Sequence, residues 1–230
     1  AVTPAKGKEM FIANTTGTSS SDRIEGMIKN AVYGIITAKA SGVKNPTVGI
    51  LNVDGARQTE MALNQLKEGG YDFQWATSAR ADGGAVLRGN DVLQGTPDVL
   101  VTDSLTGNVL IKMLSAYTTG GSFEGTGYGY GPGIGKGYDK LILIISRASG
   151  APLIANALEF AAQLVRGKYQ KIYYGPEEDG PYSLIYNRVL ALLLSIEGVE
   201  NFAVLTVNGT TADVMLQADQ VPVLKEVSVT

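Results

Sequence analysis

The strongest indication of the fold is the stretch Asp98-Val-Leu-Val-Thr-Asp-Ser-Leu-Thr-Gly-Asn-Val-Leu-Ile-Lys112. Its apolar run, Val99 to Val101, is typical of a short buried strand, and an amphipathic helix is expected from Val109 onward. The polar turn between them, residues 102–108, then lies at the carboxyl end of a strand and beside the beginning of a helix. In open α/β sheets this is where ligands bind, because free backbone N–H groups and the helix dipole face the crevice.

Five residues of this stretch are candidates for an anion site. We expect Asp103 to be a catalytic carboxylate, held ionised by the nearby helix, that orients a phosphate-binding Arg or Lys or binds a cofactor group. Thr106 and Gly107 offer a hydroxyl and a closely approachable backbone for phosphate, and Asn108 offers a catalytic amide. The alternative is an ordinary strand–helix turn that one of these polar side chains caps. Lys112 is either a cation of the site or a solvated surface lysine.

A second candidate loop, Ser146-Arg-Ala-Ser-Gly150, follows an apolar strand and precedes a helix. Arg147 is the predicted catalytic cation, because a planar guanidinium matches two phosphate oxygens. A surface salt bridge is the alternative role for it. Ser146, Ser149 and Gly150 are predicted to bind phosphate, the last two through N–H donors of the helix start.

Strands and helices alternate along the chain, which predicts an α/β fold with a mostly parallel sheet and helices on both faces. The expected strands are 48–53, 71–76, 99–102 and 141–146, and the expected helices are 22–42, 58–68, 109–117 and 152–166. Right-handed crossovers place the carboxyl ends of such strands on one edge. Asn52, Asp103 and Ser146 are therefore expected to share that edge, and Asn52 and Asp54 are added as substrate-binding residues.

Composition excludes several classes of chemistry. The chain has 230 residues, no Cys and no His, so thiolate nucleophiles, Ser-His-Asp triads and zinc–thiolate sites are excluded within it. We predict no metal site. A net charge of −3 without a basic run argues against nucleic acid as the main partner. The longest apolar run is far too short to span a bilayer and no signal peptide is recognisable, so a cytoplasmic protein is expected.

Several motifs occur in an order that resembles a known family. Gly89-Asn-Asp through Gly95, Asp98 and Asp103 to Lys112, together with Pro46-Thr-Val-Gly-Ile-Leu-Asn-Val-Asp54, resemble the signature regions of phosphate acyltransferases. The run Gly127-Tyr-Gly-Tyr-Gly-Pro-Gly-Ile-Gly135 and the segment 145–155 are similar to the alpha subunit of glycine reductase protein C. The resemblance covers residues 8–168. It implies one half of an isopropylmalate-dehydrogenase-like acyltransferase fold.

The character of the chain changes after Lys168. We predict three parts: an α/β domain at 1–168, a connector at 169–180 and a small helix-plus-hairpin module at 181–230. Within the module, residues 181–196 read as a helix, and Asn208-Gly209 is a hairpin signal before a partner strand at 211–216. The segment 221–230 alternates like a terminal strand. These last 60 residues resemble the C-terminal end of baseplate J-like phage tail proteins.

Two functions follow from these resemblances. The acyltransferase resemblance implies acyl transfer between a thioester carrier and phosphate, yielding acetyl phosphate in a glycine reductase complex. Phosphate and an acyl thioester would be the substrates, with no covalently bound cofactor. A partner subunit would carry the thioester, and an oligomer is expected. The alternative is a non-enzymatic tail or baseplate component. The glycine-rich run 125–137 is either a mobile lid or substrate channel, or a disordered segment.

Overall fold

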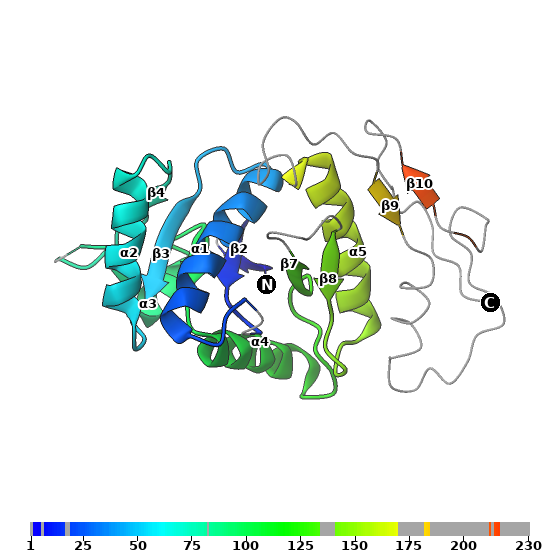
Figure 1. Cartoon of the computed structure of the whole chain (residues 1–230). Helices are drawn as coiled ribbons and strands as arrows, with labels where there is room; N and C mark the ends of the chain where they lie inside the picture. Colours follow the sequence, from blue (N-terminus) through cyan, green and yellow to red (C-terminus); the bar gives the residue numbers. More distant parts are fainter. Residues whose placement is uncertain are drawn as a thin grey trace.

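The computed structural model describes residues 2–5, 7–16, 19–81, 83–133, 141–169, 182–184, 212 and 214–216 (Figure 1). The strands are β1 (Val2–Ala5), β2 (Lys8–Ala13), β3 (Thr47–Leu51), β4 (Gln74–Trp75), β5 (Val86–Leu87), β6 (Val99–Val101), β7 (Tyr130–Gly133), β8 (Ile142–Ile144), β9 (Tyr182–Leu184) and β10 (Val214–Leu216). The helices are α1 (Arg23–Ala40), α2 (Ala56–Glu68), α3 (Gly89–Gln94), α4 (Ser104–Thr119) and α5 (Ala151–Arg166).

A six-stranded sheet forms the centre of the α/β part. Its strand order is β1-β2-β6-β3-β4, and β5 also pairs with β3. Every pairing is parallel except that of β1 with β2. Val101 is in register with Ala13 on one side and with Ile50 on the other, so β2, β6 and β3 end at the same level. The carboxyl ends of these strands therefore form one edge, as the sequence predicts.

Helices cover both faces of this sheet. Alternate residues of β2 point to opposite sides, as strand geometry requires. Phe11 and Ala13 pack in a core with α1, α2 and α5, and the rings of Phe11 and Phe160 lie 6.3 Å apart between their centroids. Met10 and Ile12 pack on the other side, in a core that includes Ile111 of α4 and is completed by α3. The predicted fold class is thus confirmed.

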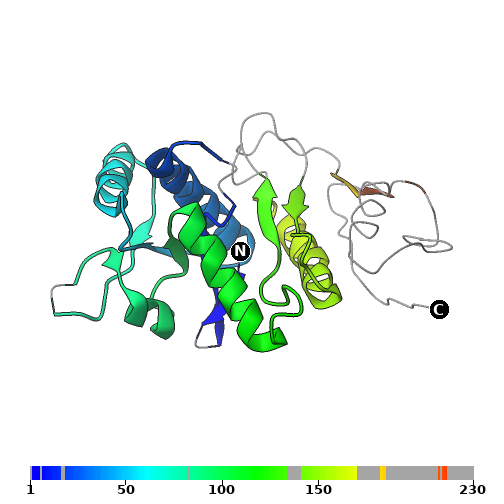
Figure 2. The ribbon, with the colours of Figure 1, turned by 90° about the horizontal axis from the view of Figure 1, so that it is seen from below.

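Two local predictions are wrong. The helix after β6 begins at Ser104 and not at Val109, because Asp103 caps it and residues 104–108 form its first turn. The strand expected at 141–146 does not join the central sheet. Its observed part, β8, pairs antiparallel with β7, and this pair lies between α4 and α5 (Figure 2). A short apolar run predicts a strand but does not identify the strand's neighbour.

Two aspartates of the family-like motifs have structural partners. Asp98 accepts hydrogen bonds from the Thr47 amide at 2.9 Å and from the Thr47 hydroxyl at 2.8 Å, and it pairs with Lys8 at 2.7 Å. It thereby ties the amino ends of β2, β3 and β6 together. Asp91 is buried and accepts from the Ser78 hydroxyl at 3.0 Å and the Arg88 amide at 2.9 Å, which fixes the beginning of α3.

The described residues of the C-terminal part form one antiparallel pair. Residues 182–184 are strand β9 and pair with β10, so the helix expected from residue 181 is wrong at its beginning. The described Val214–Leu216 is a strand, as expected. The strand predicted to end at Asn208-Gly209, the rest of the expected helix (185–196) and the terminal strand at 221–230 lie outside the described residues. Among the described helices, none is long and apolar enough to cross a membrane.

Candidate functional site

The carboxyl edge of the sheet carries buried polar groups where β2 and β6 end. Asn14 and Thr15 follow β2, and Thr102 follows β6; all three are buried. Asn14 adopts a positive φ of 82°, which Asn tolerates better than most residues. The Thr102 hydroxyl is fully buried and has no hydrogen-bond partner among the described residues.

Asp103 is the N-cap of α4. Its carboxylate accepts from the Thr106 amide at 3.0 Å and from the Thr106 hydroxyl at 2.6 Å. Burial alone would raise the pKa of Asp103, but these hydrogen bonds outweigh it and bring the pKa below its ordinary value. The carboxylate is therefore ionised, as expected, and the capping role is realised. Both of its oxygens are committed to the helix.

The first turn of α4 packs directly on the loop after β2. A Cβ atom on Gly107 would lie 2.3 Å from the carbonyl oxygen of Asn14, so only glycine allows this approach. Asn108 donates from its side-chain amide to the Thr15 carbonyl at 3.1 Å. Asn108 is thereby held at the carboxyl edge with its amide oxygen left as an acceptor.

Asn52 and Asp54 lie on the same edge, after β3. Both are exposed. Asn52 uses its backbone amide to bond the Leu87 carbonyl at 2.8 Å, which extends the β3–β5 pairing by one residue. The Asp54 carboxylate forms an ion pair with Arg23 at the beginning of α1. Any substrate role for Asp54 would therefore involve Arg23 as well.

The Ser146–Gly150 turn does not present free amides from its last two residues. The Ser149 amide donates to the Ser146 carbonyl at 3.0 Å, and the Gly150 amide donates to the Glu124 carbonyl at 3.1 Å. Pro152 in the first turn of α5 has no N–H to offer. The expectation that Ser149 and Gly150 offer N–H donors to phosphate is therefore wrong, because the fold uses both groups internally. Arg147 is exposed and makes no ion pair with any described residue.

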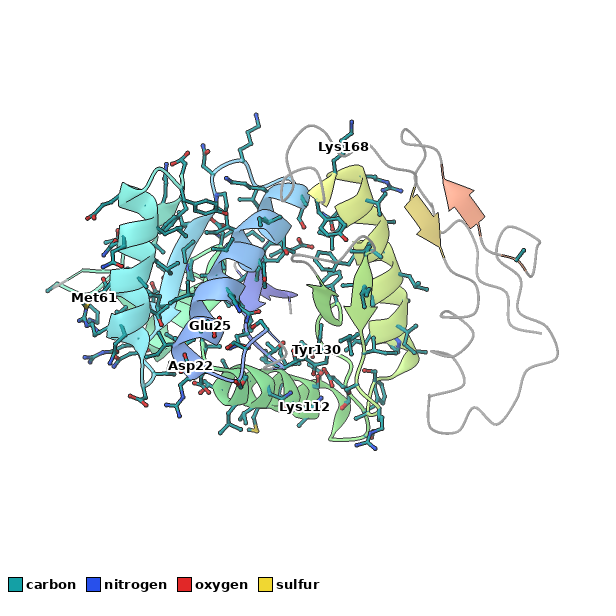
Figure 3. All side chains as sticks on the ribbon, viewed as in Figure 1. Asp22, Glu25, Met61, Lys112, Tyr130 and Lys168 are labelled. Atoms are coloured by element: carbon teal, nitrogen blue, oxygen red, sulfur yellow. The ribbon has the colours of Figure 1, made fainter. Side chains whose placement is uncertain are left out.

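A buried polar network links this turn to α4 and β7. The Glu124 carboxylate accepts from the Lys112 ammonium, from the Tyr130 hydroxyl and from the Ser146 hydroxyl, the last at 2.6 Å. Lys112 also donates to Tyr130 at 3.1 Å, and its Nζ lies 3.4 Å from the Ser146 oxygen. Figure 3 shows Lys112 and Tyr130 side by side in this region. Lys112 is therefore not simply solvated, although 40% of its side chain is exposed.

Electrostatics fix the protonation states within the network. Burial raises the pKa of Glu124, but hydrogen bonds from Lys112, Ser146 and Tyr130 outweigh burial and lower the pKa below its ordinary value. Burial, together with the hydrogen bond to Glu124 and the Glu124 charge, raises the pKa of Tyr130 far above its ordinary value. The carboxylate is thus ionised and the phenol neutral, so the Lys112 charge has a buried counter-charge.

The convergence expected at the sheet edge is realised only in part: β8 is not in the central sheet, so Ser146 does not share the edge with Asn52 and Asp103 and is connected to α4 through Lys112. Asn108 and Lys112 lie one helical turn apart on the same face of α4, and Lys112 contacts Ser146. Sequence reasoning missed Glu124 and Tyr130, whose partners lie up to 22 residues away in the chain. The only signal was the placement of tyrosines within the glycine-rich run. It also missed Asn14 and Thr15, because β2 was not predicted.

Two family models match successive parts of the chain. A family model described as fatty acid synthesis protein matches residues 1–175. The chain belongs to this family. A model for the Baseplate J-like protein C-terminal domain matches residues 177–230. Both resemblances expected from the sequence are confirmed, and the two matches meet at residues 175–177, inside the range predicted as a connector.

Individual relatives match the α/β part. The chain is 63% identical over 171 residues to the glycine/sarcosine/betaine reductase complex component C subunit alpha of Peptoclostridium acidaminophilum, covering 74% of this chain and 44% of the relative. It is 33% identical over 116 residues to a phosphate acyltransferase of Phenylobacterium zucineum, covering 48% and 30%. A phosphate acyltransferase of Lysinibacillus sphaericus is 31% identical over 120 residues, covering 50% and 33%. The chain thus spans less than half the length of these curated relatives.

Proposed function

We propose that the α/β part of this chain takes part in acyl transfer between a thioester carrier and inorganic phosphate. Its family and its phosphate acyltransferase relatives support this general class. The observation that carries the proposal is the contact between the Lys112 ammonium and Ser146, which connects the Ser146–Gly150 turn to α4 at the residue one helical turn after Asn108. Arg147 and the strand–helix motif then serve one site.

The reaction needs no covalent catalysis by the protein. A phosphate oxygen attacks the thioester carbonyl carbon, the C–S bond breaks, and the thiolate leaves with the electron pair. The thiolate takes up the proton that hydrogen phosphate releases, giving an acyl phosphate and a free thiol. Phosphate is already an anionic nucleophile, so positioning and charge stabilisation suffice. Arg147 supplies the charge that binds the transferring oxygens. Asp103 and Asn108 shape the other side of the site, and no covalently bound cofactor is required.

The remaining predicted binding residues belong to the same proposal. Thr106 and Gly107 form the α4 end of the site, and Asn52 and Asp54 form the β3 end; the side chains of Ser146 and Ser149 and the backbone of Gly150 shape the turn that carries Arg147. Because Thr106 and Ser146 already have intramolecular partners, we expect them to act mainly by holding this geometry.

The finer assignment rests on the reductase relative. Its name places it in a glycine/sarcosine/betaine reductase complex as subunit alpha of component C. We therefore propose acetyl as the acyl group and acetyl phosphate as the product. A companion subunit of a cytoplasmic complex would carry the acyl thioester, and the chain would act as part of an oligomer.

The test uses acetyl coenzyme A with phosphate or arsenate and measures release of free thiol. Arsenate replaces phosphate, and its acyl ester hydrolyses spontaneously, which pulls the reaction forward. Arg147→Ala should lower the rate about a hundredfold, as loss of a charged transition-state donor does. Arg166→Ala is the matched control, since Arg166 is an exposed arginine in the last turn of α5, the helix that follows the Arg147 turn. Thiol release that does not depend on phosphate, arsenate or Arg147 would refute the proposal.

One observation favours a second function. The match of residues 177–230 to the Baseplate J-like C-terminal domain supports a structural role in a tail-like assembly. Size-exclusion chromatography with light scattering distinguishes the two. A ring or higher multimer that is lost when residues 177–230 are removed would favour the structural role, whereas an assembly that depends on the α/β part would count against it.

A further inference from the structure

Glu124 is a buried carboxylate whose side-chain hydrogen-bond donors each come from a different helix, strand or turn. It is 2% exposed, and its two oxygens accept from Tyr130 of β7, Lys112 of α4 and Ser146 of the turn before α5. Three donors on one carboxylate leave it satisfied and ionised. These contacts connect three segments that are separated along the chain.

The backbone of Glu124 is also hydrogen-bonded to the Ser146–Gly150 turn. Its amide donates to the Ala148 carbonyl at 2.6 Å, and its carbonyl accepts from the Gly150 amide at 3.1 Å. The Phe123 ring fills the space where a Cβ on Gly150 would stand, 2.3 Å away. The Ser146 hydroxyl also accepts from the Ala148 amide at 3.2 Å. Contacts with Phe123 and Glu124, together with hydrogen bonds within the turn, therefore fix the positions of Ser146, Ala148 and Gly150.

Stability alone does not explain this arrangement. The ion pair itself gains little, because taking the Glu124 carboxylate out of water costs about as much as its attraction to Lys112 returns. The buried carboxylate does fix geometry, since it needs all of its donors in place. The turn so fixed has one charged side chain, Arg147, and that side chain is exposed.

We propose that Glu124 is a positioning residue for Arg147. With Lys112 and Tyr130 it locks the Ser146–Gly150 turn so that the Arg147 guanidinium is presented to the transferring phosphate. Lys112 acts through Glu124, as the counter-charge that keeps the carboxylate in place. This inference rests on the proposed acyl–phosphate chemistry and names the residue that organises its phosphate subsite.

The test variant is Glu124→Gln, which keeps the shape and removes the charge. The NMR exchange rates of the Ser149 and Gly150 amides report the turn directly, and we expect both to rise at least about tenfold as the turn opens locally. The KM for phosphate should rise about tenfold or more, because a small misplacement of a binding group is costly. The KM for the acyl thioester should change little.

The matched control is Asp91→Asn, another buried and hydrogen-bonded carboxylate, on α3. It should lower stability without changing either the turn's exchange rates or the KM for phosphate. Tyr130→Phe is the second variant if Glu124→Gln does not fold; it removes one donor and should give a smaller change in the same direction.

The outcomes separate the two proposals. Unchanged exchange at Ser149 and Gly150 in both variants would overturn the positioning role. Faster exchange with a phosphate KM no different from that of Asp91→Asn would also overturn it, leaving a purely structural network. If the wild-type protein transfers no acyl group to phosphate, the proposed function fails, and with it the role assigned to Arg147, whatever the exchange rates show.

Discussion

Asp103 shows at the scale of one residue how a capping role and a catalytic role compete for the same carboxylate. Both carboxylate oxygens accept hydrogen bonds from Thr106, so the side chain acts first as the cap at the beginning of α4. Asp103→Ala should destabilise the protein by about 1 kcal/mol, the usual cost of losing an N-cap acceptor. Asp103→Asn keeps an acceptor and should lose less. Urea unfolding of the three proteins measures this, and an Asp103→Ala variant as stable as the wild type would show that the cap contributes nothing.

The pH dependence of that difference has a definite sign. The pKa of Asp103 in the folded protein lies below its ordinary value of 3.8. Its contribution is therefore fully present above that ordinary value and is lost as pH falls through the lower folded value. The stability advantage of the wild type over Asp103→Ala should shrink on acidification below pH 3.8. An advantage that stays constant down to strongly acidic pH would contradict the lowered pKa.

Sequence patterns identified local roles of residues better than distant partnerships. The charge of Asp103 and its position before a helix follow from neighbours in the chain. Glu124 looks unremarkable in sequence, because the partners that make it a buried anion come from α4, β7 and the turn before α5. The hydrogen bonds that occupy the Ser149 and Gly150 amides also depend on Glu124, or on how the turn folds, and no local pattern reports them.

Helix α4 carries the main argument at the scale of elements, because its first turn is docked on the loop after β2. Gly107→Ala would normally favour a helix by about 1 kcal/mol. Here the new Cβ would meet the Asn14 carbonyl oxygen at 2.3 Å, a backbone atom that cannot move aside cheaply. We expect a net destabilisation of about 1–3 kcal/mol, the usual cost of overpacking.

The control for this substitution is Gly89→Ala in α3. A Cβ on Gly89 would meet nothing within 4 Å, so this variant should be neutral or slightly stabilising. Urea unfolding of both variants gives the comparison. If Gly107→Ala were as stable as the wild type, the close approach of α4 to Asn14 would be disproved.

Periodicity predicted α1, α2 and α5 and the strands β3 and β6 to within a few residues, because each carries its own apolar pattern. It failed where pairing decides the element. The strand β8 was expected in the central sheet, but an apolar run fits equally well beside β7. Strand β2 was not predicted, because an apolar run of only four residues, Met10 to Ala13, does not distinguish a strand from a buried helix segment.

At the scale of the whole molecule, the core of the α/β part extends past its expected boundary. Tyr169, the first residue of the predicted connector, is 1% exposed and belongs to the same core as α1 and α5. Tyr169→Ala should therefore cost about 3 kcal/mol, as large-to-small changes of buried aromatic residues do. Lys168→Ala, at the exposed neighbouring position, should cost little. Thermal or urea unfolding of the two variants measures the difference.

The same residue decides where the chain can be divided. If the two family matches correspond to separate domains, limited proteolysis should cut within 170–180 and leave a folded fragment that retains Tyr169.

A fragment of residues 1–175, the extent of the first family match, should unfold cooperatively with nearly the stability of the α/β part in the whole chain. A fragment ending at Lys168 should be markedly less stable, because it lacks a buried aromatic ring of the core. Equal stability of the two fragments would show that Tyr169 adds nothing to the stability of the α/β part. A chain that resists cleavage between 170 and 180 and unfolds in one transition would show that the two parts form a single cooperative unit.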